Sequence, residues 1–222
     1  MTHHAGLRRI AGLLVATAFI AGCQPTAGAD ASGGGPMLAT AMDTILFGRN
    51  VAIHHGCGDC HGGGDNPSAP VWLSGSRDTI FGQFRIPTPD GQVFLTKPRN
   101  ITPDDETGIG RFSEQQIFNA LRFGLRPGET PDVEITSTTP GEGNFPMTPK
   151  FLAPPMPWPA FRHMSDLELR SIAAYLKRGV RPSANKVQDS EGPPDFWAGL
   201  YGQLIGTYPA PAFPAAGEKT PG

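Results

Sequence analysis

The pentapeptide Cys57-Gly58-Asp59-Cys60-His61 places a strong chemical condition on this chain. Cysteines at this spacing can each form a thioether with one vinyl group of the same porphyrin, and the histidine that follows them then lies under the metal. The motif therefore predicts covalent haem c, held by Cys57 and Cys60, with His61 as the proximal ligand of the iron. Because the motif occurs once in the chain, we expect one haem.

Two other kinds of site also use a C-x-x-C spacing: the thioredoxin-type redox pair and one half of a zinc site. Both fit this sequence less well. A zinc site needs a second Cys or His pair at ligand spacing, and a thioredoxin motif needs a βαβ context. Glycines at positions 56, 58 and 62–64 should also let the backbone approach a flat ring closely.

The N-terminus has the order of regions found in an export signal. Arg8 and Arg9 precede an apolar run at 10–21, which is too short for a good membrane span, and Gly22-Cys23 follows. Residues 20–23 resemble the end of a bacterial lipoprotein signal, whose cysteine is lipidated and becomes the new N-terminus. We expect removal of residues 1–22 and lipidation of Cys23, with ordinary cleavage beyond Cys23 as the alternative. Since bacteria attach haem c outside the cytoplasmic membrane, both features predict a membrane-anchored periplasmic protein.

Composition narrows the class of protein further. The formal net charge is −2 and becomes more negative once Arg8 and Arg9 are removed, so the chain lacks the basic surface that nucleic acid requires. With 24 prolines and 29 glycines in 222 residues, much of the chain should be loop. We expect a flexible tether at 23–41, a haem domain at 42–187 and a C-terminal extension at 188–222. In that extension, an apolar segment at 196–205 should pack on the domain.

Periodicity and capping residues indicate a mainly α fold with a short hairpin. A helix should begin near Asp43 and end at Gly56, just before the haem motif. Capping boxes at 113–116 and 165–168 predict two more helices, which should end at Gly124 and Gly179. Residues 83–86 and 92–95 flank a Pro-Asp-Gly turn of the kind that favours a hairpin.

The sixth ligand of the iron decides between an electron carrier and a catalyst. Met156 is the favoured candidate, because the prolines of Ala153-Pro154-Pro155-Met156-Pro157-Trp158-Pro159 stiffen an extended segment that can hold a thioether in place. Met147 lies in a weaker version of the same arrangement, and an open iron site is the third option. Met164 directly precedes a helix cap and is better suited to a hydrophobic staple.

These motifs together resemble the class I cytochromes c, which carry one haem in a small helical domain. Within that class, four segments make the chain similar to the cytochrome c subunits of bacterial membrane alcohol and aldehyde dehydrogenases: 100–110, 120–124, Met156-Pro157-Trp158 and Tyr175-Leu176. The resemblance implies crossed N- and C-terminal helices, with Gly48 and Tyr175 at their contact. Those subunits usually carry several haem domains, whereas this chain has one motif.

The sequence favours a lipid-anchored electron carrier that is not itself an enzyme. His61 and Met156 would both stay bound to the iron, so its geometry would change little during electron transfer. Its donor and acceptor would be redox proteins, such as a membrane dehydrogenase or a terminal oxidase. Arg99 and Asn100 are candidates for binding a haem propionate, or else a solvated surface pair. The alternative is a haem enzyme or sensor subunit with an openable sixth position, with His163 available as an acid or base.

Overall fold

The computed structural model describes residues 40–76, 83–192, 195–198 and 210–220. The predicted signal sequence, Cys23 and residues 199–205 of the apolar segment lie outside this range. The described elements are helices α1 (Ala41–His54), α2 (Cys57–His61), α3 (Glu114–Phe123), α4 (Trp158–Phe161) and α5 (Asp166–Arg178), a 3-10 turn (Pro127–Glu129), and strands β1 (Phe84–Pro87) and β2 (Val93–Thr96). None of the helices in these ranges is long and apolar enough to cross a membrane.

Helices α3 and α5 begin at the capping boxes that the sequence predicts. The Ser113 hydroxyl accepts the Gln116 N–H at 3.0 Å, and the Gln116 side chain accepts the Ser113 N–H at 3.1 Å. Ser165 and Glu168 form the same reciprocal pair at the start of α5. Each box satisfies N–H groups that a helix start leaves without partners, and Gly124 ends α3 in the left-handed conformation. The predicted bounds of both helices are confirmed.

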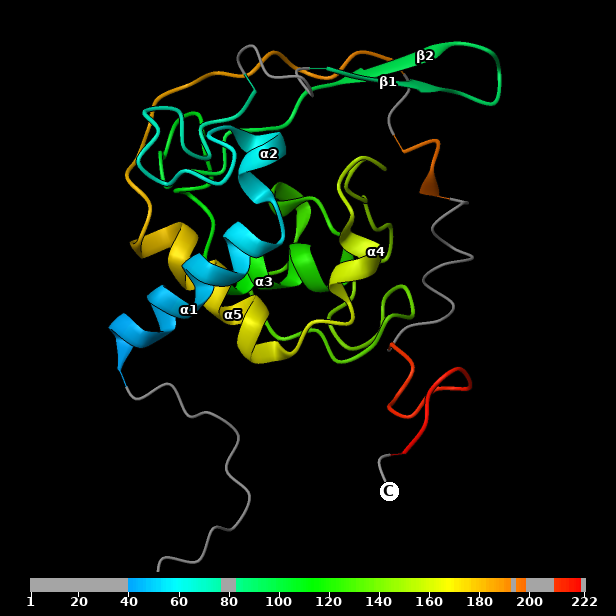
Figure 1. Cartoon of the computed structure of the whole chain (residues 1–222). Helices are drawn as coiled ribbons and strands as arrows, with labels where there is room; N and C mark the ends of the chain where they lie inside the picture. Colours follow the sequence, from blue (N-terminus) through cyan, green and yellow to red (C-terminus); the bar gives the residue numbers. More distant parts are fainter. Residues whose placement is uncertain (1–39, 77–82, 193–194, 199–209, 221–222) are drawn as a thin grey trace, which may run out of the picture. The chain divides into compact units, whose positions relative to one another are not determined.

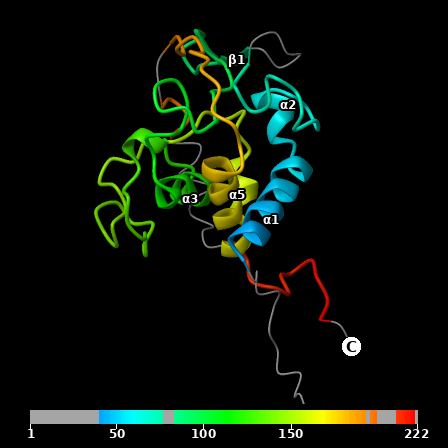
Figure 2. The ribbon, with the colours of Figure 1, turned by 90° about the vertical axis from the view of Figure 1, so that its left-hand side faces the viewer.

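Helix α5 lies between α1 and α3 and packs against both, as Figure 2 shows. Where α1 crosses α5, Gly48 lies so close that a Cβ atom there would be 1.8 Å from the Ser171 carbonyl oxygen. Gly48 therefore lies at the helix contact, as expected, and it packs on the backbone of Ser171, four positions before Tyr175 on α5. Tyr175 is buried and accepts a hydrogen bond from the Trp72 indole at 2.8 Å, which ties the loop after α2 to α5.

The predicted hairpin is confirmed as the antiparallel pair β1 and β2 (Figure 1). Its base is held by the segment after α5, because Leu95 and Glu191 exchange two backbone hydrogen bonds of 2.8 and 2.9 Å. Phe94 is buried and packs edge-on against Trp197, with 4.9 Å between ring centroids. The prediction that the apolar segment packs on its own domain is therefore confirmed for Phe196 and Trp197, which both contact Phe94.

Candidate functional site

The two cysteines of the motif lie on the single turn of α2, which Gly56 begins in the left-handed conformation. Both thiols are free and partly buried. Burial raises the pKa of Cys57 to about 11, and burial with the nearby Asp59 charge raises the pKa of Cys60. A thioredoxin-type cysteine instead needs a lowered pKa, because the thiolate is its reactive form. The raised pKa values of Cys57 and Cys60 therefore do not fit a thioredoxin-type pair.

His61 ends α2 and is held at both its backbone and its ring. Its carbonyl accepts the Gly75 N–H at 2.7 Å, and its Nδ1 lies 2.7 Å from the Arg99 carbonyl oxygen. Since a carbonyl can only accept, Nδ1 carries the proton and the lone pair of the neutral ring is on Nε2. Burial lowers the pKa of His61 and so favours the neutral ring. The hydrogen bond to the Arg99 carbonyl has a smaller, opposite effect. A metal-binding histidine commonly has this arrangement.

The donor set fits haem c: paired free thiols and, on the same helical turn, an imidazole whose second nitrogen is already bound to a carbonyl. A zinc site fits less well. Within residues 40–76, 83–192, 195–198 and 210–220, no group of three or more His, Cys, Asp or Glu side chains is arranged to hold a metal ion.

The glycines around the motif allow close contacts within the protein itself. A Cβ atom on Gly58 would lie 2.1 Å from the Gly64 carbonyl oxygen, and one on Gly62 would lie 2.7 Å from the Val71 carbonyl oxygen. Gly63 likewise faces Trp72. At these three positions the glycines make room for the loop that follows α2.

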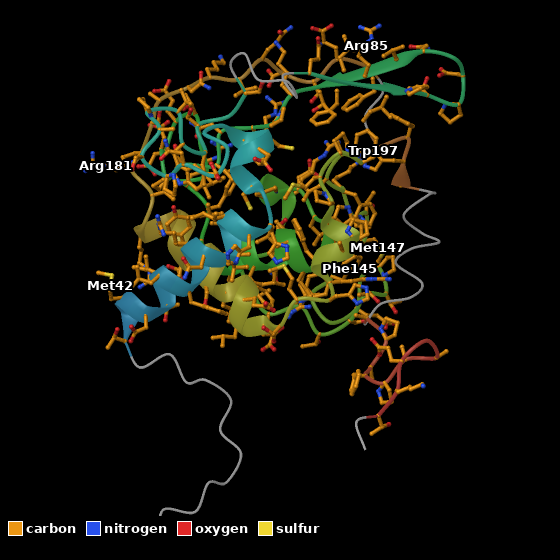
Figure 3. The ribbon with its side chains drawn as sticks, in the orientation of Figure 1. Met42, Arg85, Phe145, Met147, Arg181 and Trp197 are labelled. Atoms are coloured by element: carbon orange, nitrogen blue, oxygen red, sulfur yellow. The ribbon has the colours of Figure 1, made fainter. Side chains whose placement is uncertain are left out.

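The structure separates the two candidate methionines by their surroundings. Met156 is partly buried and packs against the hydrophobic core, and its backbone N–H bonds to the Ala153 carbonyl at 2.9 Å. Met147 is 73% exposed on an outer loop (Figure 3). Met164 is buried just before α5, consistent with the expected staple. A stiff, partly buried thioether loses less entropy on binding a metal than an exposed one, which favours Met156.

The segment that leads to Met156 is tied to the end of α3. Gly124 accepts the Leu152 N–H at 2.7 Å, and the Arg126 N–H donates to Lys150 at 2.8 Å. A Cβ atom on Gly124 would lie 2.2 Å from the Trp158 ring, so the glycine is needed for this close contact. Trp158 also stacks on Phe151, with 6.0 Å between centroids. Met156 therefore lies between Leu152 and Trp158, which both contact Gly124 at the end of α3.

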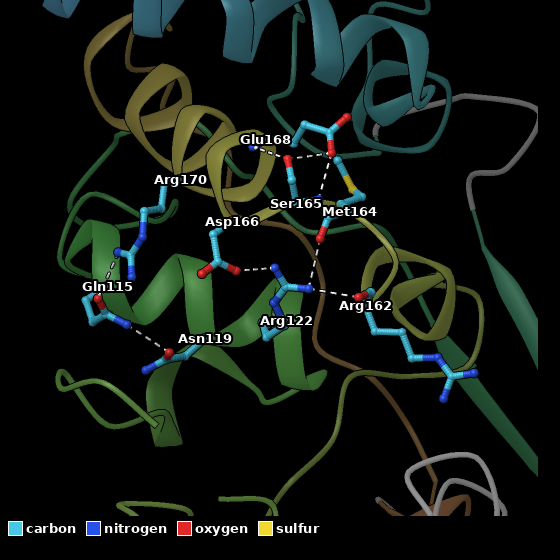
Figure 4. A network of polar contacts seen from close by, with 9 residues as sticks. All are labelled: Gln115, Asn119, Arg122, Arg162, Met164, Ser165, Asp166, Glu168 and Arg170. Atoms are coloured by element: carbon cyan, nitrogen blue, oxygen red, sulfur yellow. Dashed lines mark hydrogen bonds and ion pairs between the residues drawn. The ribbon is translucent and has the colours of Figure 1, made fainter. Parts of the chain in front are cut away.

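Arg122 holds the chain on the other side of Met156, after α4 (Figure 4). Its buried guanidinium donates to the carbonyl oxygens of Arg162 and Met164 at 2.8 and 2.9 Å and pairs with Asp166. His163, the candidate acid or base, lies in this turn and is exposed, with Nε2 3.4 Å from the Arg162 Nε.

The side chains of Arg99 and Asn100 have internal partners. The Asn100 amide donates to Thr107 and Ser183 and accepts from Thr102, so both of its N–H groups are used within the protein. The guanidinium of Arg99 binds residues 187–190, which follow α5. Sequence reasoning missed the role of the Arg99 carbonyl, because a backbone acceptor has no residue-type signal.

Asp195 also escaped the sequence analysis. Its carboxylate, 14% exposed, pairs with Arg126 at 2.8 Å and with Lys150 at 3.4 Å. It therefore joins the C-terminal segment to the point where the Met156 segment is tied to the chain after α3. Asp189, by contrast, is 91% exposed where it pairs with Arg99.

This contrast predicts unequal effects on stability. We expect Asp195→Ala to lower the free energy of unfolding by about 1–2 kcal/mol, because it leaves two cationic groups without their shielded acceptor. Asp189→Ala should change it by less than about 0.5 kcal/mol, as is usual for an exposed pair. Denaturant unfolding of both variants measures the difference, and equal effects would contradict the structural distinction.

Comparison with known proteins points to the same class of protein as the site. No protein-family model matches the chain. The gluconate 2-dehydrogenase cytochrome c subunit of Pantoea cypripedii is 32% identical over 113 residues, which are 50% of this chain and 20% of the relative. The cytochrome c subunit of the quinone alcohol dehydrogenase of Gluconobacter oxydans is 33% identical over 115 residues, covering 50% of this chain and 19% of the relative.

A third relative extends the match along the chain. The fructose dehydrogenase cytochrome subunit of Gluconobacter japonicus is 28% identical over 174 residues, which are 66% of this chain and 29% of the relative. The chain thus spans between about a fifth and a third of the length of these relatives. Together with the paired thiols and the bound histidine, these similarities make the chain a cytochrome c-like protein that resembles the cytochrome c subunits of bacterial dehydrogenases.

Proposed function

We propose that this protein transfers electrons through one haem c bound covalently to Cys57 and Cys60, with His61 and Met156 as the axial ligands. The observation that carries the proposal is the hydrogen bond from His61 Nδ1 to the Arg99 carbonyl, which leaves Nε2 available beside two free thiols. When bound, the haem supplies a reversible one-electron Fe(II)/Fe(III) couple.

The arrangement of the chain also supports a class I cytochrome c fold. An N-terminal helix ends at the haem motif and crosses the C-terminal helix α5, and the methionine segment lies between α3 and α5 along the chain. Firmly held axial ligands suit electron transfer, because the geometry at the iron then changes little between its two oxidation states and the reorganisation energy stays small. The anchors at Gly124, Arg126 and Arg122 would supply that restraint for Met156.

Expression of the full chain with and without a haem c maturation system tests this function. With maturation, we expect haem that stays with the polypeptide after denaturation, one haem per chain by mass and by haemochrome absorbance, and reversible one-electron reduction. Cys57→Ser with Cys60→Ser should abolish covalent attachment, since each thioether needs a sulfur. Absence of covalent haem from the matured wild type would overturn the proposal.

We further propose export to the periplasm and a lipid anchor on Cys23, as its lipoprotein-like signal suggests. In bacterial cells, the wild type should fractionate with membranes and incorporate labelled fatty acid. Cys23→Ser should lose the label and, where ordinary cleavage still occurs, release the protein to the soluble periplasmic fraction. An unlabelled wild type would contradict the anchor while leaving the haem proposal intact.

The partners we propose are redox proteins: a membrane dehydrogenase as the donor and another redox protein, such as a terminal oxidase, as the acceptor. The names of the three relatives described above, which are dehydrogenase cytochrome subunits, support the donor class. Kinetics of haem reduction by purified membrane dehydrogenases would identify a donor.

A further inference from the structure

The segment after α5 runs along the chain that supplies the acceptor for His61. We call residues 183–191 the C-terminal strap, drawn in orange shades between α5 and the hairpin in Figure 1. One end is held where Asn100 donates to the Ser183 carbonyl at 2.7 Å, and the other end where Leu95 and Glu191 form their backbone pair. Between them, Lys97 donates to Gln188 at 3.0 Å.

Arg99 connects this strap to the proximal histidine, because its backbone carbonyl binds His61 and its side chain binds the strap. Its carbonyl accepts the His61 Nδ1–H at 2.7 Å. Its guanidinium donates to four acceptors of the strap, namely the carbonyl oxygens of Val187 (3.2 Å) and Gln188 (3.1 Å), the carboxylate of Asp189 (3.2 Å) and the hydroxyl of Ser190 (3.3 Å). A planar guanidinium can bridge several acceptors in a fixed geometry, and an ammonium group cannot.

The backbone on either side of Arg99 has separate anchors. The Pro98 carbonyl accepts the Ser76 N–H at 3.0 Å, and the Ile101 N–H donates to Leu73 at 3.0 Å. A change in the Arg99 side chain should therefore loosen residue 99 without unfolding the segment around it. This makes the side chain a separable element of the site.

We propose that Arg99 is a positioning residue: by binding the strap, its guanidinium fixes the carbonyl that accepts the His61 Nδ1–H and so sets how strongly this imidazole donates to the haem iron. The proposal rests on the proposed function, in which His61 binds that iron. A firm hydrogen bond at Nδ1 increases electron donation by the ring and stabilises Fe(III). A looser carbonyl should therefore favour Fe(II) and raise the reduction potential.

The test uses the full-length, haem-loaded protein and the Arg99→Lys variant, which keeps the positive charge but loses the planar guanidinium. We expect the equilibrium ratio of Fe(II) to Fe(III) at a fixed potential to rise several-fold, up to about tenfold, which corresponds to at most about 59 mV. By NMR, the His61 Nδ1 proton should exchange with solvent several-fold faster. Arg85→Lys, on the exposed face of the hairpin (Figure 3), is the matched control and should change neither quantity.

A merely structural role for Arg99 would give a different result. In that case Arg99→Lys would lower the melting temperature but leave the potential and the Nδ1 proton exchange equal to those of Arg85→Lys, which would overturn the proposal. If Arg99→Lys fails to fold, Arg99→Gln replaces it. Because Arg99→Gln also removes a positive charge, which changes the potential directly, only the exchange rate of the His61 Nδ1 proton then decides. If the wild type carries covalent haem but Arg99→Lys changes neither the potential nor the proton exchange, only this inference is refuted. If the wild type carries no haem, the proposed function is refuted as well.

Discussion

Met156→Ala is expected to open the sixth position of the haem iron. In the ferric wild type, the methionine-to-iron charge-transfer band should be present, and carbon monoxide should not bind to the reduced protein. The variant should lose the band completely and bind carbon monoxide readily, because no other side chain of the segment carries a suitable donor. Its reduction potential should also fall, since methionine as the sixth ligand raises the potential.

Met147→Ala is the matched control for this prediction. Met147 is exposed on its loop, so its removal should leave the band, the potential and the carbon monoxide response unchanged. If the band is lost in Met147→Ala and kept in Met156→Ala, the ligand assignment is wrong. If the wild type binds carbon monoxide readily, the electron-carrier hypothesis gives way to a haem enzyme or sensor.

Gly48→Ala should produce the largest loss of stability among the single methyl additions considered. The new Cβ would lie 1.8 Å from the Ser171 carbonyl oxygen and 2.3 Å from its carbon, and these are backbone atoms that cannot rotate away. Helix α1 would have to move off α5. We expect the free energy of unfolding to fall by about 3 kcal/mol, which lowers the melting temperature by about 6–12 °C at this chain length.

The sign of this effect separates two physical influences. Helix propensity alone predicts that alanine in place of glycine stabilises α1 by about 1 kcal/mol. Thermal and denaturant unfolding of the haem-loaded protein should show that the destabilising steric clash is larger than this gain in helix propensity. Gly217→Ala is the control, because a Cβ there would meet nothing within 4 Å. A stabilised Gly48→Ala variant would show that the two helices do not cross at this contact.

Local sequence signals predicted the elements of this fold well where a capping or turn residue marks a boundary. The boxes at Ser113 and Ser165 gave the starts of α3 and α5, and the Asp-Gly turn indicated the hairpin. Such signals work because capping and turn hydrogen bonds involve residues within a few positions of each other. The short helix α4 had no comparable start signal, since Pro157 occupies its N-cap position.

The contacts between distant segments could not be predicted in this way. Nothing in the sequence around Arg99 indicates that its carbonyl bonds to His61 or that its guanidinium binds the strap near position 188. Likewise, Asp195 reaches Arg126 across 69 positions. These pairs depend on where the packed helices bring the loops, and many residue types can be placed there.

The sequence by itself determined the chemistry of the candidate site, because a haem c motif is a local spacing of thiols and imidazole that one helical turn can present. Only the tertiary structure decided how the imidazole is held, which methionine is partly buried, and that Gly48 meets the backbone of Ser171. Ligand identity is local, whereas ligand orientation and exposure follow from the packing of segments far apart in the chain.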